Sequence, residues 1–198
     1  MLSVMAATSL ALSLLVAPEA PSTADVVPPG KITVDVVTVN GSGCPAGTAA
    51  VAVADDNTAF TVTYSDYTAQ FRKNCQLNLR VHYPQGFTFG IAKADYRGFA
   101  SLPRGAKGMQ RASYYFSGSS STGTSTHNIP GPKSDNWQFT DQTDVAEIVF
   151  APCGMVRNLN VNTEVRAFTN SANQASFVSM DSTDGSFNTR YQFAWKRC

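Results

Sequence analysis

The sequence contains few of the residues that carry most enzyme chemistry. Only 15% of its 198 residues are charged, and it has 2 histidines. Beyond residue 24 its glutamates are Glu147 and Glu164 alone. Acid-base catalysis needs titratable groups held in a cleft, so this scarcity argues against an enzyme. The formal net charge of +1 also gives no electrostatic reason to expect a nucleic acid or a membrane surface as partner.

Both histidines are predicted to face water. His82 falls on the polar face of an alternating segment. His127 lies between Ser117 and Pro132, a stretch so rich in serine, threonine and glycine that we expect a mobile surface loop. A Ser-His-Asp site requires a histidine held between its partners. Neither histidine meets that requirement in the sequence pattern.

The acidic residues are predicted to be solvated or to lie in turns. Glu147 and Glu164 occupy outward positions of expected strands. The pairs considered for a glycosidase or calcium site are Asp55 with Asp56, Asp141 with Asp144 and Asp181 with Asp184. Each pair sits among turn-forming residues, where aspartate bonds its own backbone. We therefore expect no metal and no cofactor.

The N-terminal segment has the pattern of a secretory signal peptide. An apolar run from Val4 to Val16 is followed by small residues and prolines up to Ala24. The run is too short to span a bilayer comfortably. We expect residues 1–24 to be cleaved, residues 25–31 to form an extended lead-in, and the mature protein to be extracellular and free of the membrane.

Four cysteines in an exported chain predict two disulfides. They are Cys44, Cys75, Cys153 and Cys198, and four cysteines allow three pairings. No two of them have the C-x-x-C spacing of a zinc site. We expect Cys44 to pair with Cys75 and Cys153 with Cys198, because each pair then bounds a contiguous block that contains strands.

The clearest strand pattern lies between Cys75 and Tyr83. Leu77, Leu79, Val81 and Tyr83 alternate with polar residues, which is the period of a half-buried strand. Pro84 to Gly86 is a turn signal, and Phe87, Phe89 and Ile91 alternate after it. The two segments are predicted to pair as a hairpin, with Tyr83 opposite Phe87 and Val81 opposite Phe89.

About ten such segments follow one another without a convincing helix. Strong examples are 32–39, 60–64 and 158–165. Alternating strands separated by turn residues are typical of two packed antiparallel sheets. We predict an all-β antiparallel β-sandwich, jelly-roll-like, formed by residues 32–198 as a single monomeric domain with two disulfides.

Four short motifs carry a family resemblance. They are Gly43-Cys-Pro-Ala-Gly-Thr48, Pro152-Cys-Gly154, Leu159-Asn-Val-Asn-Thr163 and Trp195-Lys-Arg-Cys198. In these the chain resembles a family of small secreted bacterial and fungal proteins known only as a domain of unknown function, from about Lys31 to the end. Ala151 stands where a serine is common in that family. The resemblance implies export and paired cysteines, and it supplies no catalytic residue.

Surplus aromatic residues indicate binding rather than catalysis. Tyr114, Tyr115 and Trp137 are the candidate ligand contacts, because exposed aromatic faces suit a polysaccharide or a protein partner. Two alternatives remain open. The basic stretch Arg104 to Arg111 would suit a protease inhibitor, and an extracellular hydrolase acting on polysaccharide or protein would need a site that the sequence does not reveal.

Overall fold

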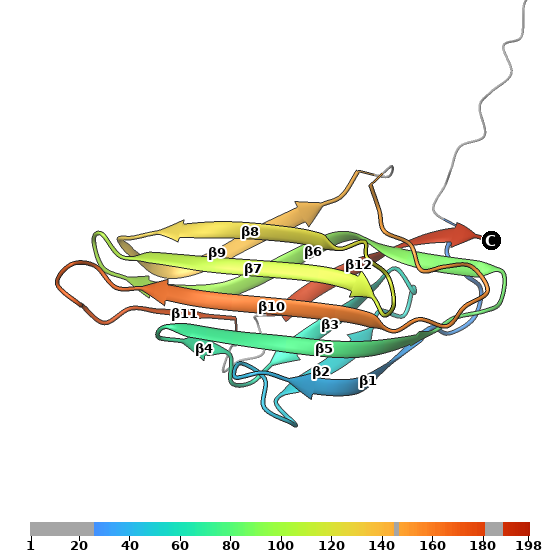
Figure 1. The fold of residues 1–198 in the computed structure, drawn as a ribbon, viewed down its shortest axis with the longest axis horizontal. Helices are drawn as coiled ribbons and strands as arrows, with labels where there is room; N and C mark the ends of the chain where they lie inside the picture. Colours follow the sequence, from blue (N-terminus) through green and yellow to red (C-terminus); the bar gives the residue numbers. More distant parts are fainter. Residues whose placement is uncertain (1–25, 145–146, 181–187) are drawn as a thin grey trace, which may run out of the picture.

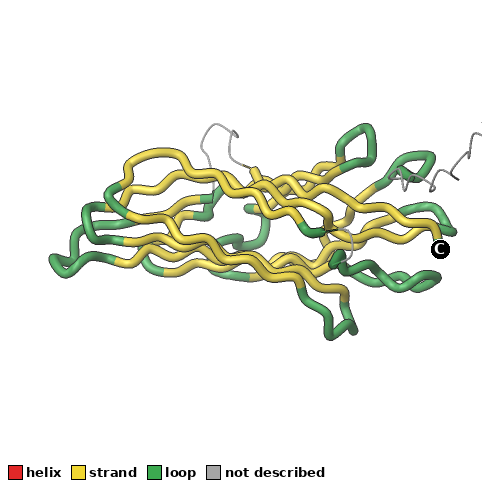
Figure 2. The backbone as a smooth tube through the Cα atoms, turned by 90° about the horizontal axis from the view of Figure 1, so that it is seen from above, coloured by secondary structure: helices red, strands yellow, loops and turns green. Residues whose placement is uncertain are grey.

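The computed structural model describes residues 26–144, 147–180 and 188–198. These residues form an antiparallel β-sandwich of two sheets with two disulfides. Figure 2 shows the strands gathered in two layers. The prediction of an all-β sandwich is therefore confirmed. The predicted signal peptide and the acid pair Asp181 and Asp184 lie outside the described residues.

The first sheet runs across the front of the molecule in Figure 1, in the order β1-β5-β10-β7-β8. Its strands are β1 (Thr33–Asn40), β5 (Arg72–His82), β10 (Leu159–Phe168), β7 (Lys107–Phe116) and β8 (Gly123–Pro130). Alternation decides which side chains face the core. In β10, for example, Leu159, Val161 and Val165 are buried, while the intervening polar side chains point outward.

The second sheet has the order β2-β3-β12-β6-β11-β4, and β9 also pairs with β6. Its strands are β2 (Ala49–Val53), β3 (Ala59–Tyr64), β4 (Thr68–Ala69), β6 (Phe87–Leu102), β9 (Lys133–Gln142), β11 (Phe177–Ser179) and β12 (Asn188–Arg197). The long strand β6 is the centre of this sheet, since β12, β11 and β9 all pair with it. The expected turn at Asp55 to Asn57 does connect β2 and β3.

The core between the sheets is rich in aromatic rings. Phe89 contacts the rings of Phe116, Phe193 and Trp195 at centroid distances of 5.2, 5.5 and 5.8 Å. Such contacts add roughly 1 kcal/mol each beyond the area they bury. These ring contacts hold β6 against β7 across the core and beside β12 within its own sheet. The pocket described below lies next to these strands.

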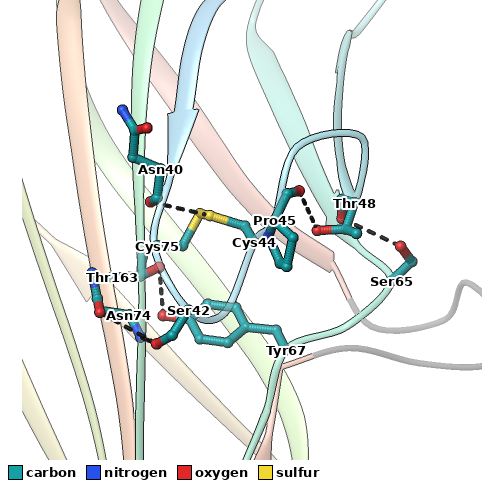
Figure 3. The surroundings of a disulfide bond; sticks show 10 residues. All are labelled: Asn40, Ser42, Cys44, Pro45, Thr48, Ser65, Tyr67, Asn74, Cys75 and Thr163. Carbon is teal, nitrogen blue, oxygen red and sulfur yellow. Dashed lines mark hydrogen bonds between the residues drawn. A yellow bond between two sulfur atoms is a disulfide. The ribbon is translucent and has the colours of Figure 1, made fainter.

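Both disulfides have the predicted pairing. Cys44 is bonded to Cys75 and Cys153 to Cys198, with Cα–Cα distances of 5.3 and 5.6 Å. Figure 3 shows that the first disulfide secures the turn between β1 and β2 over the ring of Tyr67. Gly43 allows this approach, because a Cβ atom there would lie 2.2 Å from that ring. The hydroxyl of Tyr67 is 3.1 Å from Thr163 Oγ1.

The predicted hairpin of β5 with β6 is wrong. β5 pairs with β1 and β10, whereas β6 belongs to the other sheet. Pro84 to Gly86 therefore carry the chain from one layer to the other. The apolar faces of both strands still meet, since the rings of Tyr83 and Phe89 are 5.4 Å apart, but they meet across the core. Alternation shows which face of a strand is buried, but it does not show which other strand it pairs with.

The predicted mobile loop from Ser117 to Pro132 is also wrong for half of its length. Residues 123–130 form β8, which pairs with β7 from Lys107 to Tyr114. Its inward side chains include Ser125, His127 and the buried Ile129. The composition is that of a loop, but strand β7 supplies the backbone partners that a polar segment needs.

Candidate functional site

A pocket of about 360 Å³ opens where the two sheets meet beside β8 and β9. Its walls combine aromatic and aliphatic side chains with carboxylates, hydroxyls and an amide. They come from both sheets: Ile91, Tyr114, Tyr115, Phe116, Thr124, Ser125, Thr140, Asp141, Gln142, Thr143, Glu147, Val149 and Leu159. Ligand pockets of proteins have this mixed character and volumes of roughly 300–1,000 Å³.

Asp141 is the centre of the polar wall. It lies in β9 rather than in the expected turn, and its side chain is 19% exposed. His127 Nε2 donates a hydrogen bond to Asp141 Oδ1 at 2.7 Å. The hydroxyls of Ser125 and Tyr114 both donate to Asp141 Oδ2, the latter at 3.5 Å. The carboxylate is therefore held by donors from β7 and β8 of the opposite sheet.

His127 is fixed by packing as well as by this hydrogen bond. Its ring stacks on Phe139 with a centroid distance of 4.4 Å and an interplanar angle of 7°. Phe139 and Asp141 both project from β9, so one strand supplies a flat surface and an anion for the same imidazole. The prediction that His127 faces water from a loop is wrong.

The phenols of Tyr96, which is buried, and of Tyr114, which is half-buried, continue the network inward. The hydroxyls of Tyr96 and Tyr114 are hydrogen-bonded to each other. Burial raises the pKa of Tyr96 well above its usual value, and it raises the pKa of Tyr114 as well. Both phenols are therefore neutral near neutral pH and act as hydrogen-bond donors and acceptors. Hydrogen-bond donors thus surround the carboxylate of Asp141, and the carboxylate of Glu147 lines the same pocket.

The arrangement does not form a Ser-His-Asp triad. In a triad the serine donates to the histidine, and the carboxylate holds the histidine from the other side. Here Ser125 and His127 both bond to Asp141, so the serine has no base beside it. The geometry is that of a pre-organised carboxylate, which suits binding better than acyl transfer.

Of the three aromatic residues predicted as ligand contacts, two line the pocket and one does not. Tyr114 and Tyr115 are half-buried, and both line the pocket. Trp137 is only 5% exposed, packs against Phe139 at 5.4 Å and contributes nothing to the pocket. An exposed ring at Trp137 is therefore ruled out. Its neighbour Gly98 leaves the space that the indole fills, because β6 and β9 pair at these two residues.

Sequence reasoning missed Ser125 and His127 as site residues and placed Asp141 in a turn. One signal was available. Ser125, His127 and Ile129 alternate with Thr124, Thr126 and Asn128, which is the period of a strand. The surrounding serines and glycines obscured that period.

Of the other described residues considered for chemistry, Glu147 lines this pocket, whereas His82, Asp55, Asp56, Asp144 and Glu164 do not. His82 is exposed as expected and bonds to Asp35 at 2.7 Å. Glu147 is exposed, but it lies outside any strand and lines the pocket. The basic stretch is not an extended inhibitor loop. Pro103 to Ala106 close a tight turn, in which Ala106 N donates to Pro103 O at 3.0 Å, and residues 107–111 belong to β7.

Glu164 lies on the outer face of the front sheet between two arginines. Arg72 Nε donates to Oε2 at 2.7 Å and Arg166 Nε donates to Oε1 at 2.5 Å. Partial burial raises the pKa of Glu164, but the hydrogen bonds and charges of the arginines outweigh it. The pKa therefore lies below the ordinary value of 4.5.

Glu164→Gln is expected to lower the free energy of unfolding by about 1 kcal/mol at about pH 7. Because the folded-state pKa is below the unfolded one, this contribution is complete above the unfolded pKa and is lost as the pH falls through the folded pKa. Urea denaturation of both proteins at about pH 7 and about pH 3 measures the difference. An equal difference at both pH values would contradict this assignment.

Within residues 26–144, 147–180 and 188–198, no group of three or more histidine, cysteine, aspartate or glutamate side chains is placed to hold a metal. The same residues include no helix with the length and apolar character needed to cross a membrane.

Comparison with known proteins places the chain in a family. Residues 30–198 match the model described as "Domain of unknown function (DUF4360)". This chain belongs to the DUF4360 family. An uncharacterized secreted protein of Arthroderma benhamiae is 35% identical over 179 residues, which are 86% of this chain and 73% of that protein. This DUF4360 chain is a secreted protein.

Two solved structures show a distant likeness to this DUF4360 domain. The structure of TmCBM61 in complex with β-1,4-galactotriose has a TM-score of 0.31 at 10% identity, covering 81% of this chain and 88% of that one. The active domain of the bacteriophage CBA120 tailspike protein 4 has a TM-score of 0.26 at 10% identity, covering 85% and 19%. Scores this low support no inference about function.

Proposed function

We propose that this secreted β-sandwich binds a carbohydrate, a short stretch of an extracellular polysaccharide, in the pocket beside β8 and β9. The observation that carries the proposal is the convergence of Tyr114 and Tyr115 with Asp141, Gln142 and Thr140 in one pocket of about 360 Å³. A sugar ring has an apolar face that packs on aromatic rings and hydroxyls that need hydrogen-bond partners. This pocket offers both kinds of contact.

The rigidity of Asp141 supports binding. Its two oxygens accept from His127, Ser125 and Tyr114, yet an ionised carboxylate offers about four acceptor positions. A ligand hydroxyl thus finds an anion whose position is already set. Pre-organised groups bind with a smaller entropic cost than flexible ones.

The proposal is tested by titrating the protein with a panel of neutral plant and fungal polysaccharides and following binding by calorimetry. Tyr115→Ala and Gln142→Ala are expected to weaken binding tenfold or more, as anchor residues do. Tyr115 is preferred to Tyr114 because truncating Tyr114 also removes bonds to Tyr96 and Asp141.

Phe71→Ala is the matched control. Phe71 is an aromatic residue outside the pocket and is 78% exposed, so its removal is expected to leave the affinity unchanged. Loss of binding in Phe71→Ala with retention in Tyr115→Ala and Gln142→Ala would contradict the proposal. Failure of every polysaccharide to bind would contradict it as well.

A second candidate, glycoside hydrolysis, is favoured by one observation. Asp141 and Glu147 line the same pocket, and glycosidases use two carboxylic acids on either side of the scissile bond. Incubation with the bound polysaccharide and assay of new reducing ends decides between the two. If the wild type hydrolyses the polysaccharide, and if Asp141→Asn and Glu147→Gln both lose this activity but still bind, the protein is a glycoside hydrolase.

A further inference from the structure

One asparagine has the sequence context of an N-glycosylation acceptor. Asn40 is followed by Gly41 and Ser42, and no other asparagine in the chain has serine or threonine two positions later. An acceptor needs this hydroxyl two residues on and any residue but proline between. The chain is secreted and has two disulfides, so in a eukaryotic host it passes through the compartments where such modification occurs.

The structure leaves the Asn40 side chain free to carry a glycan. Asn40 is the last residue of β1 and is exposed. Among the described residues its side-chain amide has no hydrogen-bond partner, and Figure 3 shows it pointing away from the disulfide between Cys44 and Cys75. The neighbouring Ser42 is also exposed.

We propose that Asn40 carries an N-linked glycan when the chain passes through a eukaryotic secretory pathway, and that the glycan protects the edge of the front sheet. β1 is the outermost strand of that sheet. It exposes two adjacent valines, Val36 at 36% and Val37 at 50%. An exposed apolar edge strand is a template for pairing with another chain, and a bulky polar group beside it obstructs such pairing.

The order of events during folding is compatible with this site. The acceptor lies four residues before Cys44, in a turn that the bond to Cys75 closes. In the folded chain, hydrogen bonds from Gly43 N to Asn74 O at 2.8 Å and between Ser42 and Asn74 hold this turn as well. Before β1 and β5 pair, neither these bonds nor the disulfide holds residues 40–43. Gly41 has a φ of +129° in the folded turn, which shows how far this backbone departs from an extended chain once the turn is closed.

The test is secretion of the full chain from yeast, followed by intact-mass spectrometry before and after treatment with peptide-N-glycosidase F. The wild type and Ser42→Thr are expected to lose the mass of one glycan and to gain aspartate at position 40. Asn40→Gln and Ser42→Ala are expected to show no such shift. Asn128→Gln, an exposed asparagine outside the motif, is the control and is expected to behave like the wild type.

Each result decides the proposal. An unmodified wild type, or a mass shift that persists in Asn40→Gln, overturns the acceptor site. The protective role is measured on the same samples by light scattering as protein concentration rises. More aggregation in Asn40→Gln than in the wild type supports it, and equal aggregation overturns it. Asn40→Gln keeps the polarity and exposure of the residue, so it does not by itself disturb the fold.

Discussion

Replacing Cys44 and Cys75 together by alanine is expected to lower the free energy of unfolding by about 4 kcal/mol. The disulfide joins residues 31 positions apart, and its loss returns the entropy of that loop to the unfolded chain. Both cysteines are buried, so their truncation also removes core packing. Equilibrium unfolding in guanidinium chloride measures the change.

The second disulfide is the natural control. Cys153 and Cys198 are 45 positions apart, so the entropic contribution is again about 4 kcal/mol. Both of these cysteines are exposed, and their removal opens no cavity. Cys44→Ala with Cys75→Ala is therefore expected to be the more destabilising pair. The opposite order would contradict the packing shown in Figure 3.

Gly98→Ala is expected to destabilise the protein by about 3 kcal/mol, the upper range for inserting a methyl group into a packed site. A Cβ atom at Gly98 would lie 1.9 Å from Ser179 O and 2.5 Å from Trp137 Cζ2. Neither can move easily, because Ser179 belongs to β11 and Trp137 to β9, which both pair with β6. Thermal and chemical unfolding measure the loss.

Gly86→Ala separates this steric effect from backbone strain. Gly86 has a φ of +81°, and a Cβ atom added there would have no neighbour within 4 Å, so only the backbone conformation resists alanine. This backbone strain is expected to lower the free energy of unfolding by about 1 kcal/mol. If Gly98→Ala costs no more than Gly86→Ala, the close packing of Trp137 on β6 is wrong.

The sequence by itself determined the class of fold, many of the strands and the disulfides. Alternation in segments such as Leu159 to Val165 specifies a half-buried strand whatever its partner is, because successive side chains point to opposite faces. The spacing of the four cysteines around strand-containing blocks predicted both bonds correctly. The alternation is a local property and depends on no distant part of the chain.

Only the tertiary structure decided which strands pair. The turn at Pro84 to Gly86 permits a hairpin, but β5 gains two partners in the front sheet, and β6 gains others in the rear sheet. Likewise β8 is polar enough to be a loop, and it is a strand because β7 lies beside it. Hydrogen-bond partners far along the chain outweigh local preference in sheets.

The candidate site depends on tertiary structure even more strongly. Asp141, His127 and Tyr114 lie on three strands in two sheets. The sequence alone predicts Asp141 in a turn, His127 in a loop and Tyr114 as an exposed ligand contact. Their convergence follows from the packing of β8 and β7 against β9. No local pattern records it, because a carboxylate attracts its donors only after the sheets have brought them within hydrogen-bonding distance.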